Sequence, residues 1–359
     1  MLLADLMHGR DNNFNLLRII AASAVLVTHS FALSAGTGDA EPLRASLGLT
    51  MGAMAVDAFF VTSGFLVTAS LLGRSGVLEY AWARVLRIFP ALLVMLLLTV
   101  LVLGPVFTTQ PLAAYFGSGT IYKYLLKCGT LVFGVAYALP GVFEANPYQA
   151  AVNGSLWSMP YEIRMYILLA LAWIVTRALR RSEPKRAYGV VLGLAALGSL
   201  ALVLAWRPGE GAFLKLFYMF AAGAAMHAFR RRIVMSHGAF GACLVALLAG
   251  ALLGPTAFYY AYVLTVPYVL MYLVYVPAGF VRRYNRLGDY SYGVYIYAFP
   301  IQQTLLASFP GLGPGALIGL SGALTLACAW ASWHLIEHRA LEAKPIAVQR
   351  TRGWLARAG

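Results

Sequence analysis

Long apolar runs that contain almost no charge dominate this chain. Residues 238–281 and 290–336 hold no Asp, Glu, Lys or Arg, and each is interrupted by a turn signal rich in Gly and Pro, at 254–255 and at 310–315. Each stretch is long enough for two passes of about 20 residues through a bilayer. Only 11% of all residues are charged, against about 25% in an ordinary soluble domain. The sequence therefore indicates an all-α polytopic membrane protein and excludes a soluble enzyme, a disordered tail and a nucleic-acid-binding module.

The apolar runs predict about ten transmembrane helices. Their approximate limits are 14–33, 52–72, 89–108, 155–176, 187–206, 212–229, 238–254, 257–277, 288–309 and 315–336. With a cytoplasmic N-terminus, 21 of the 27 Lys and Arg residues fall on the cytoplasmic side and five fall outside. Such a bias is typical of cytoplasmic loops. We therefore predict that both termini are cytoplasmic and that the chain is a multi-pass protein of a cell membrane, the bacterial inner membrane.

Two further regions complete the predicted organisation. Residues 109–154 are expected outside the cytoplasm as a long loop, and the sequence leaves open whether 121–142, which carry Lys123 and Lys127, are embedded in the membrane. Residues 1–345 are predicted to form one membrane-embedded domain and 346–359 a basic cytoplasmic tail, with no soluble appended domain. The three cysteines lack the spacing of metal ligands, so we expect no metal site.

Four ionisable side chains stand out within the predicted spans, at one depth in their outer halves: His29, Asp57, Glu162 and Arg164. A charge in a span costs at least about 2.5–3.5 kcal/mol, which makes each a candidate functional group. A neutral imidazole at His29 can act as a general base, and a carboxylate at Asp57 can orient it and stabilise its charged form. The alternative is structural, because polar side chains also join helices, and Glu162 with Arg164 could be a structural ion pair.

Three arginines occupy the cytoplasmic ends of the predicted spans. Arg18 lies about three helical turns before His29, so both fall on nearly one face and about 16 Å apart along the helix. Arg84 and Arg87 are three residues apart and are neighbours on another helix. A pair of guanidinium groups suits a phosphate-bearing ligand, whereas simple anchoring of a cytoplasmic helix end explains most such arginines.

At these positions the chain resembles the acyltransferase-3 family of multi-pass membrane acyltransferases, over about residues 11–341. The motifs that carry the resemblance are, in chain order, Arg18-x10-His29, Asp57-Ala-Phe59-Phe60 with Ser63-Gly64-Phe65, Arg84-Val-Leu-Arg87-Ile-Phe-Pro90, Ser155-Leu-Trp157-Ser158 with Glu162, and the late motifs 287–295 and 332–337. Each motif alone is weak evidence, but together and in the family's order they are specific.

The resemblance implies transfer of an acyl group, usually acetyl from acetyl-CoA, to a hydroxyl of an extracytoplasmic polysaccharide or lipid-linked glycan. It implies a catalytic set of His29, Asp57 and Glu162, supporting roles for Arg18, Arg164 and Ser63, and binding of the coenzyme A phosphates by Arg84 and Arg87. Acyl-CoA would be a co-substrate, with no tightly bound cofactor. The family often has a His where this chain has Ala298-Phe299, and often a Pro where it has His338; we expect neither departure to touch the catalytic set.

These expectations combine into one mechanism, with two rivals. His29 would deprotonate the acceptor hydroxyl, and a nearby donor, with Arg164 as a candidate, would stabilise the oxyanion. The partners would be acyl-CoA, the glycan acceptor and membrane lipid, with no nucleic acid. One rival is a proton-coupled transporter of a small anionic solute or acyl donor, because intramembrane charges also form proton relays. The other is a non-catalytic membrane scaffold.

Overall fold

The structure is a computed structural model that describes residues 1–9, 11–73, 76–149, 151–206 and 211–358. Arg10, Arg74 and Arg207, which contribute to the predicted charge bias, lie outside these described residues. Across the described ranges the regular secondary structure is helical, and extended pairing is limited to two isolated bridges. The predicted all-α class is confirmed.

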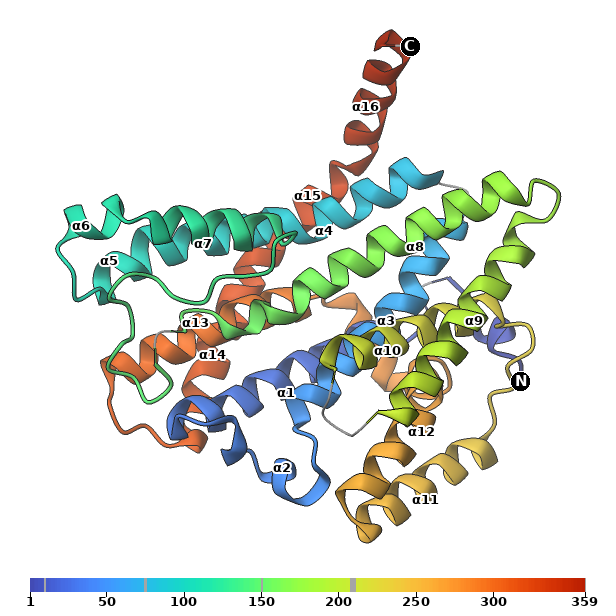
Figure 1. Cartoon of the computed structure of the whole chain (residues 1–359), viewed down its shortest axis with the longest axis horizontal. Coiled ribbons are helices and arrows are strands. Elements are labelled where there is room, and N and C mark those ends of the chain that lie inside the picture. The colour runs from blue at the N-terminus through green and yellow to red at the C-terminus, as the bar shows by residue number, and fades with distance from the viewer. Residues whose placement is uncertain (10, 74–75, 150, 207–210, 359) are drawn as a thin grey trace. The chain divides into compact units, whose positions relative to one another are not determined.

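A helix lies at each of the ten predicted spans (Figure 1). These helices are α1 (Phe14–Ala35), α3 (Met51–Leu72), α4 (Gly76–Leu98), α8 (Met159–Leu179), α9 (Pro184–Ala205), α10 (Ala212–Ala228), α11 (His237–Leu253), α12 (Pro255–Tyr275), α13 (Ser291–Ser308) and α14 (Pro314–Ser332). The breaks expected at 254–255 and at 310–315 separate α11 from α12 and α13 from α14. Hydropathy and turn residues thus located the helices.

Six helical stretches of the described chain are long and apolar enough to cross a membrane: Phe14–Ala35, Met51–Leu72, Gly76–Phe107, Pro184–Ala205, Pro255–Tyr275 and Pro314–Arg357. The helices α10 and α11, with 17 residues each, are shorter apolar segments. Together these helices make the chain a polytopic membrane protein. The number of ten spans and the cytoplasmic placement of both termini stay predictions.

Helix α4 begins well before the third predicted span, 89–108. It starts at Gly76 and continues as 32 residues through a π-helical segment at Thr99–Leu103 and α5 (Gly104–Phe107). Arg84 and Arg87 therefore lie inside α4 rather than in a loop before it. At about 1.5 Å per residue this helix is about 48 Å long, longer than the hydrocarbon core of about 30 Å, so its charged first turns do not have to enter lipid.

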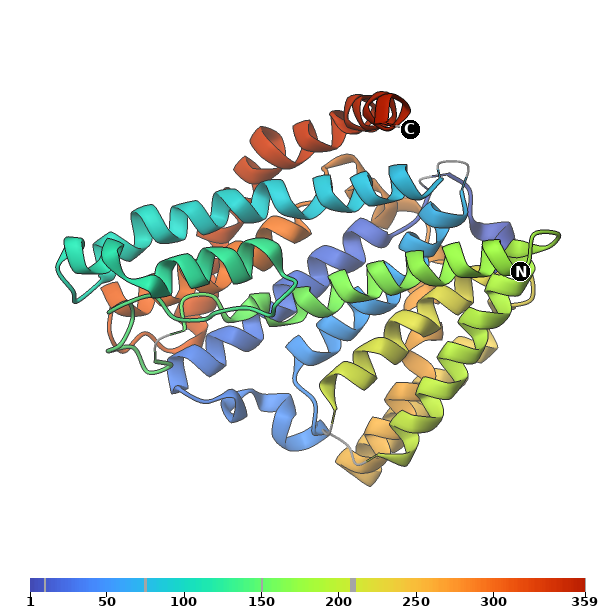
Figure 2. The same ribbon diagram turned by 45° about the horizontal axis from the view of Figure 1, so that its top comes forward.

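The chain divides into two compact units. The first unit comprises Met1–Thr28, Asp39–Leu72 and Tyr161–Asp289. In this unit α3 and α10 cross side by side, α9 packs against α10, and α11 pairs with α12 (Figures 1 and 2). The close crossing of α3 and α10 depends on glycine: a Cβ atom on Gly64 would lie 2.0 Å from the carbonyl oxygen of Phe220, and one on Gly223 would lie 2.0 Å from that of Val61. Small residues that let helix backbones touch are a principal means of helix association in membranes.

Alanine at Gly223 should therefore destabilise the first unit. The added methyl group would meet backbone atoms of α3, which cannot move as a flexible side chain would, and overpacking of this kind costs about 1–3 kcal/mol or more. Heating the detergent-solubilised protein and measuring the monodisperse fraction by size-exclusion chromatography checks the effect. Gly198→Ala in α9 is the matched control, because its methyl group would meet open space; equal behaviour of the two variants would contradict the packing argument.

The second unit comprises His29–Gly38, Gly73–Pro160 and Tyr290–Gly359. Its α13 and α14 form a hairpin. The two helices pack closely because Gly293 has no side chain: a Cβ there would lie 2.7 Å from the Cα of Ala329. The basic C-terminal segment is a helix, α16 (Lys344–Ala358) (Figure 1). It contacts α4 through a hydrogen bond of 3.1 Å from Trp82 to Thr351 and an ion pair between Arg352 and Glu79. The prediction that this tail is cytoplasmic stays a prediction.

The long segment 109–154 also belongs to the second unit. It contains α6 (Leu112–Gly117) and α7 (Gly119–Thr130), and α7 runs beside α4 (Figure 2). With 12 residues, α7 is about 18 Å long and too short to cross a bilayer by itself. The following irregular chain is tied to α13, because the Asn146 amide donates to the Gln303 side chain at 2.8 Å and Gln303 donates to the carbonyl of Ala151 at 2.7 Å. The loop is thus a packed element that faces α13.

Candidate active site

His29 lies near the C-terminal end of α1, in the part of that helix that belongs to the second unit. Its side chain is half-buried. The Nδ1 atom is 3.5 Å from Oγ of Ser155, and the ring of Phe299 packs edge-on against the imidazole with centroids 5.1 Å apart. The next residue of α1 is also engaged, since the Gln302 amide donates to Ser30 at 2.7 Å. His29 therefore has polar neighbours as well as an aromatic wall.

Ser155 is positioned by a short 3-10 helix, Gly154–Ser158, that starts the predicted fourth span. Asn153 caps this turn: its side-chain oxygen accepts from the Ser155 amide at 3.1 Å, while its amide group donates to the carbonyl of Ile296 at 2.9 Å. The hydroxyl of Tyr295 donates to the Ser155 carbonyl at 2.6 Å. The 3-10 helix and α13, which are distant in sequence, thus hold the serine beside His29.

Phe299 corrects one expectation from the sequence. The departure Ala298-Phe299 was expected to lie away from the catalytic set, but the Phe299 ring contacts His29 directly. Gly154 makes room for this ring, because a Cβ atom there would lie 2.5 Å from Cε2 of Phe299. The aromatic residue therefore forms part of the wall around the candidate base.

Asp57 lies in α3 in the first unit and is fully buried. Its Oδ2 atom accepts from Nζ of Lys215 at 2.8 Å and from the hydroxyl of Tyr262 at 3.0 Å. Lys215 comes from the first turns of α10 and is only 16% exposed. Oδ1 makes no hydrogen bond within the described residues. The ion pair with Lys215 lowers the cost of burying the carboxylate and leaves one acceptor oxygen open.

Glu162 lies in the first turn of α8, and its partners are in the same unit. The Ser63 hydroxyl donates to Oε1 of Glu162 at 3.2 Å and lies 2.7 Å from the hydroxyl of Tyr166, which also hydrogen-bonds to Glu162. Arg164 is exposed and lies over the ring of Tyr161 at 5.7 Å. No ion pair joins Glu162 to Arg164 in the part of the chain that the structure describes, in keeping with their two-residue spacing, which places them on different helix faces.

Arg18 and Arg87, which are predicted to lie at cytoplasmic helix ends, also have carboxylate partners. In the first unit, Nη1 of Arg18 is 2.8 Å from Oδ2 of Asp289. In the second unit, Nη1 of Arg87 is 3.1 Å from Oε2 of Glu337, which is 1% exposed, and the guanidinium lies 5.7 Å from the ring of Trp333. Arg84 precedes Arg87 by three residues on α4. Arg87 thus joins two of the recognised motifs, Arg-x-x-Arg and the late segment that ends in Glu337.

The structure therefore groups the predicted residues into local clusters. His29 lies with Ser155 and Phe299, Asp57 with Lys215, and Glu162 with Ser63. Sequence reasoning missed the partners, which are Ser155, Phe299, Lys215, Tyr262, Tyr166 and Asp289. Lys215 gave a usable signal, because it is a lone basic residue close to the start of an apolar run. Ser155 and Asp289 lie in motifs already recognised in the sequence, at 155–158 and 287–295, but a single sequence does not show which groups they contact.

Comparison with known proteins gives one consistent result. The acyltransferase-domain profile of the acyltransferase-3 family matches residues 11–334. An O-acetyl transferase of Shigella phage Sf6 is 28% identical over 345 residues, which cover 93% of this chain and 97% of the phage protein. Nodulation protein 10 of Rhizobium leguminosarum bv. viciae is 29% identical over 376 residues, which cover 95% of this chain and 96% of that protein. No solved structure matches at a significant level.

The match extends over nearly the whole chain and includes every quoted motif from Arg18-x10-His29 to 287–295, together with the first residues of the last motif, 332–337. It favours the acyltransferase over the transporter and scaffold alternatives. The several apolar helices agree with a membrane-embedded enzyme of this kind. The chain therefore belongs to the acyltransferase-3 family and is a membrane-bound O-acyltransferase.

Proposed function

We propose that this enzyme transfers an acetyl group from cytoplasmic acetyl-CoA to a hydroxyl of an extracytoplasmic polysaccharide or lipid-linked glycan, in the bacterial inner membrane. The observation that carries the proposal is His29, a titratable group within a helix long and apolar enough to span the membrane, held beside Ser155 and walled by Phe299. Acetyl is the proposed acyl group because the phage relative is named an O-acetyl transferase.

His29 is the proposed general base. Its Nδ1 atom faces Ser155, which leaves Nε2 to take the proton of the acceptor hydroxyl as the oxygen attacks the thioester carbonyl. The tetrahedral intermediate then collapses, the carbon–sulfur bond breaks, and the imidazolium returns the proton to the departing coenzyme A thiolate. The products are the acetyl ester and free coenzyme A, and His29 is again neutral. A positioned base of this type contributes about 10²–10⁴-fold to rate.

The other predicted residues support this reaction in our proposal. Asp57 is proposed to take part as a buried carboxylate whose charge Lys215 partly compensates, and not as a proton acceptor. Glu162 and Ser63 form a polar cluster that orients the acceptor, and Arg164 is the proposed donor to the oxyanion.

The arginines at the cytoplasmic helix ends serve the donor. Arg18, Arg84 and Arg87 are proposed to attract its phosphates by their positive charge, which Asp289 partly offsets at Arg18 and Glu337 partly offsets at Arg87. The pantetheine arm would carry the thioester toward His29 through a cavity between helices, where polar groups at membrane depth are tolerated.

The proposal predicts a specific change in the cell envelope. Glycans isolated from cells that express the enzyme should carry base-labile acetyl esters in their mass spectra, and cells that express His29→Ala at the same membrane level should lack them. Identical spectra from the two strains would refute the assignment of a glycan acceptor.

A further inference from the structure

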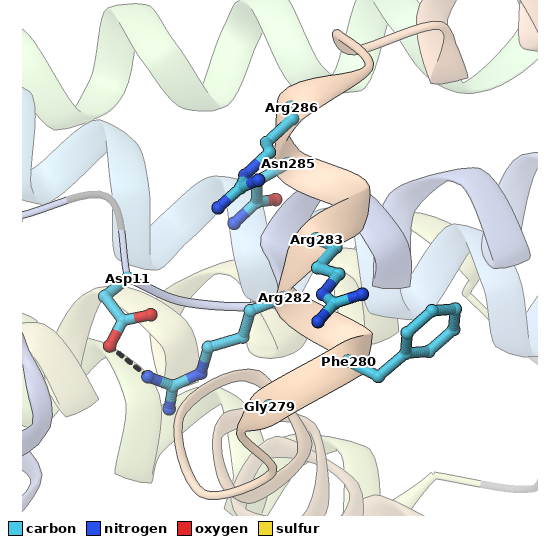
Figure 3. A pocket seen from close by; sticks show the side chains of 7 residues that line it. All are labelled: Asp11, Gly279, Phe280, Arg282, Arg283, Asn285 and Arg286. Atoms are coloured by element: carbon cyan, nitrogen blue, oxygen red, sulfur yellow. Dashed lines mark hydrogen bonds and ion pairs between the residues drawn. The ribbon is translucent and has the colours of Figure 1, made fainter.

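A basic pocket lies in the first unit, beside the 3-10 helix η5 (Gly279–Arg286) that follows α12. It encloses about 440 Å³, within the range of about 300–1,000 Å³ that is typical of ligand sites. Figure 3 shows its side chains: Asp11, Phe280, Arg282, Arg283, Asn285 and Arg286, with Gly279. Three guanidinium groups and one carboxylate give the pocket an excess of positive charge.

Only one of the three arginines is committed to holding the fold. Arg282 pairs with Asp11 and donates to the carbonyls of Tyr275, at 2.7 Å, and Pro277, at 3.0 Å (Figure 3). Arg283 and Arg286 are exposed, and neither has a carboxylate partner within the described residues. The pocket therefore offers two guanidinium forks to an anion from outside the chain.

The walls of the pocket are fixed to the start of α1. The Asn285 amide hydrogen-bonds to the carbonyl of Asn12, and the Asn13 amide donates to Pro277 at 2.8 Å. Just beyond η5, Asp289 pairs with Arg18 at 2.8 Å. A charged pocket on such an anchored segment loses less entropy on binding than a mobile loop would.

Phe280 adds an aromatic surface to the charge. Its side chain is 79% exposed, and the guanidinium carbon of Arg283 lies 5.5 Å from the ring centroid. An exposed ring in a pocket with two exposed guanidinium groups suits a ligand that combines phosphate with a planar base. Guanidinium groups bind phosphate bidentately, and aromatic faces stack on bases.

We propose that this pocket binds the phosphorylated nucleotide end of the acyl donor, with Arg283 and Arg286 on phosphate oxygens and Phe280 on the base. The inference rests on the proposed function for the identity of the donor as an acyl-CoA. The phosphate chemistry itself also fits the headgroup of an anionic lipid. The other explanation is that these arginines serve only to set the membrane topology as cytoplasmic charges, and the experiment must distinguish it from phosphate binding.

Binding to the purified enzyme in nanodiscs of zwitterionic lipid tests the proposal. Isothermal titration calorimetry is carried out with coenzyme A, with its adenosine bisphosphate fragment and with inorganic phosphate. Arg283→Lys/Arg286→Lys keeps the charge, and hence the topology, but removes the bidentate forks; Arg283→Gln/Arg286→Gln removes both. Arg180→Gln/Arg181→Gln is the matched control, because these two arginines are exposed, fall on the same predicted side and lie outside the pocket.

We expect both double variants at 283 and 286 to bind coenzyme A and the bisphosphate fragment at least about tenfold more weakly, and the control to bind normally. Phe280→Leu should weaken the nucleotides and leave inorganic phosphate unchanged. Unaltered coenzyme A binding in Arg283→Gln/Arg286→Gln would overturn the proposal. A separate arm adds phosphatidylglycerol to the nanodisc lipid. If the arginines affect only thermal stabilisation by this lipid, and not coenzyme A binding, the proposal is overturned and the pocket is assigned to lipid. Arginine-dependent nucleotide binding in an enzyme that transfers no acetyl group would support the pocket and refute the proposed function, so the two claims fail separately.

Discussion

Replacing His29 with alanine should lower the rate of acetyl transfer by about 10²–10⁴-fold, while the protein remains folded and inserted. The imidazole is the proposed base, and its loss leaves the acceptor hydroxyl without a group to take its proton. Because His29 is half-buried beside Ser155 and Phe299, the variant should lose little stability compared with the loss in rate. Transfer rates from labelled acetyl-CoA in membranes, normalised to the enzyme present, give the measurement.

A second variant at this position and a control at another histidine separate chemistry from packing. His29→Gln keeps polar atoms and most of the volume but cannot act as a base, so it should be as inactive as His29→Ala. His338→Ala, at an exposed histidine that lies 3.5 Å from Glu342, should keep full activity. Substantial activity in His29→Gln would remove the general-base role from His29.

Breaking the Asp57–Lys215 ion pair should produce the largest loss of stability. Asp57 is fully buried and Lys215 is 16% exposed, and removal of one partner from a buried pair costs about 3–5 kcal/mol because the other charge is left uncompensated. Asp57→Asn and Lys215→Met should therefore each lower the thermal denaturation temperature strongly. The combined variant should recover part of the loss, since it leaves no isolated charge.

A double-mutant cycle on thermal stability in detergent measures this coupling. The exposed pair of Arg44 with Asp39, with side chains 54% and 78% exposed, is the matched control. Asp39→Asn should have little effect, because exposed pairs contribute at most about 1 kcal/mol. Strictly additive losses at Asp57 and Lys215 would contradict the assignment of a coupled ion pair.

The positions of the helices could be predicted from the sequence, because the lipid core requires long apolar segments and leaves charge at their ends. The limits of α1, α3, α9 and α12 agree with the predicted spans to within a few residues. The predicted start of the third span, at residue 89, was wrong as the start of a helix. Helix α4 begins earlier, because the charged turns that hold Arg84 and Arg87 are helical and precede the apolar run. Hydropathy marks where a helix must be apolar, and does not mark where it must end.

The candidate groups could be predicted, but their partners could not. Asp57 and His29 stand out as ionisable residues in apolar runs, where each requires an explanation. The pairing of Asp57 with Lys215 joins two helices 158 residues apart in sequence, and it follows from the glycine contact between α3 and α10, which a single sequence does not reveal. The same limit explains why Phe299 was placed outside the site and why the partners of Arg18 and Arg87 were missed.

The central claim is that the enzyme, with His29 as its general base, transfers an acetyl group from a cytoplasmic donor to an acceptor on the other side of the membrane. Inside-out membrane vesicles supplied externally with acetyl-CoA labelled in its acetyl group test this most directly. We predict that the label becomes ester-linked to glycan in the vesicle lumen with the native enzyme and not with His29→Ala. Equal labelling by the two proteins, or label that reaches glycan only when acetyl-CoA is enclosed in the lumen, would contradict the account.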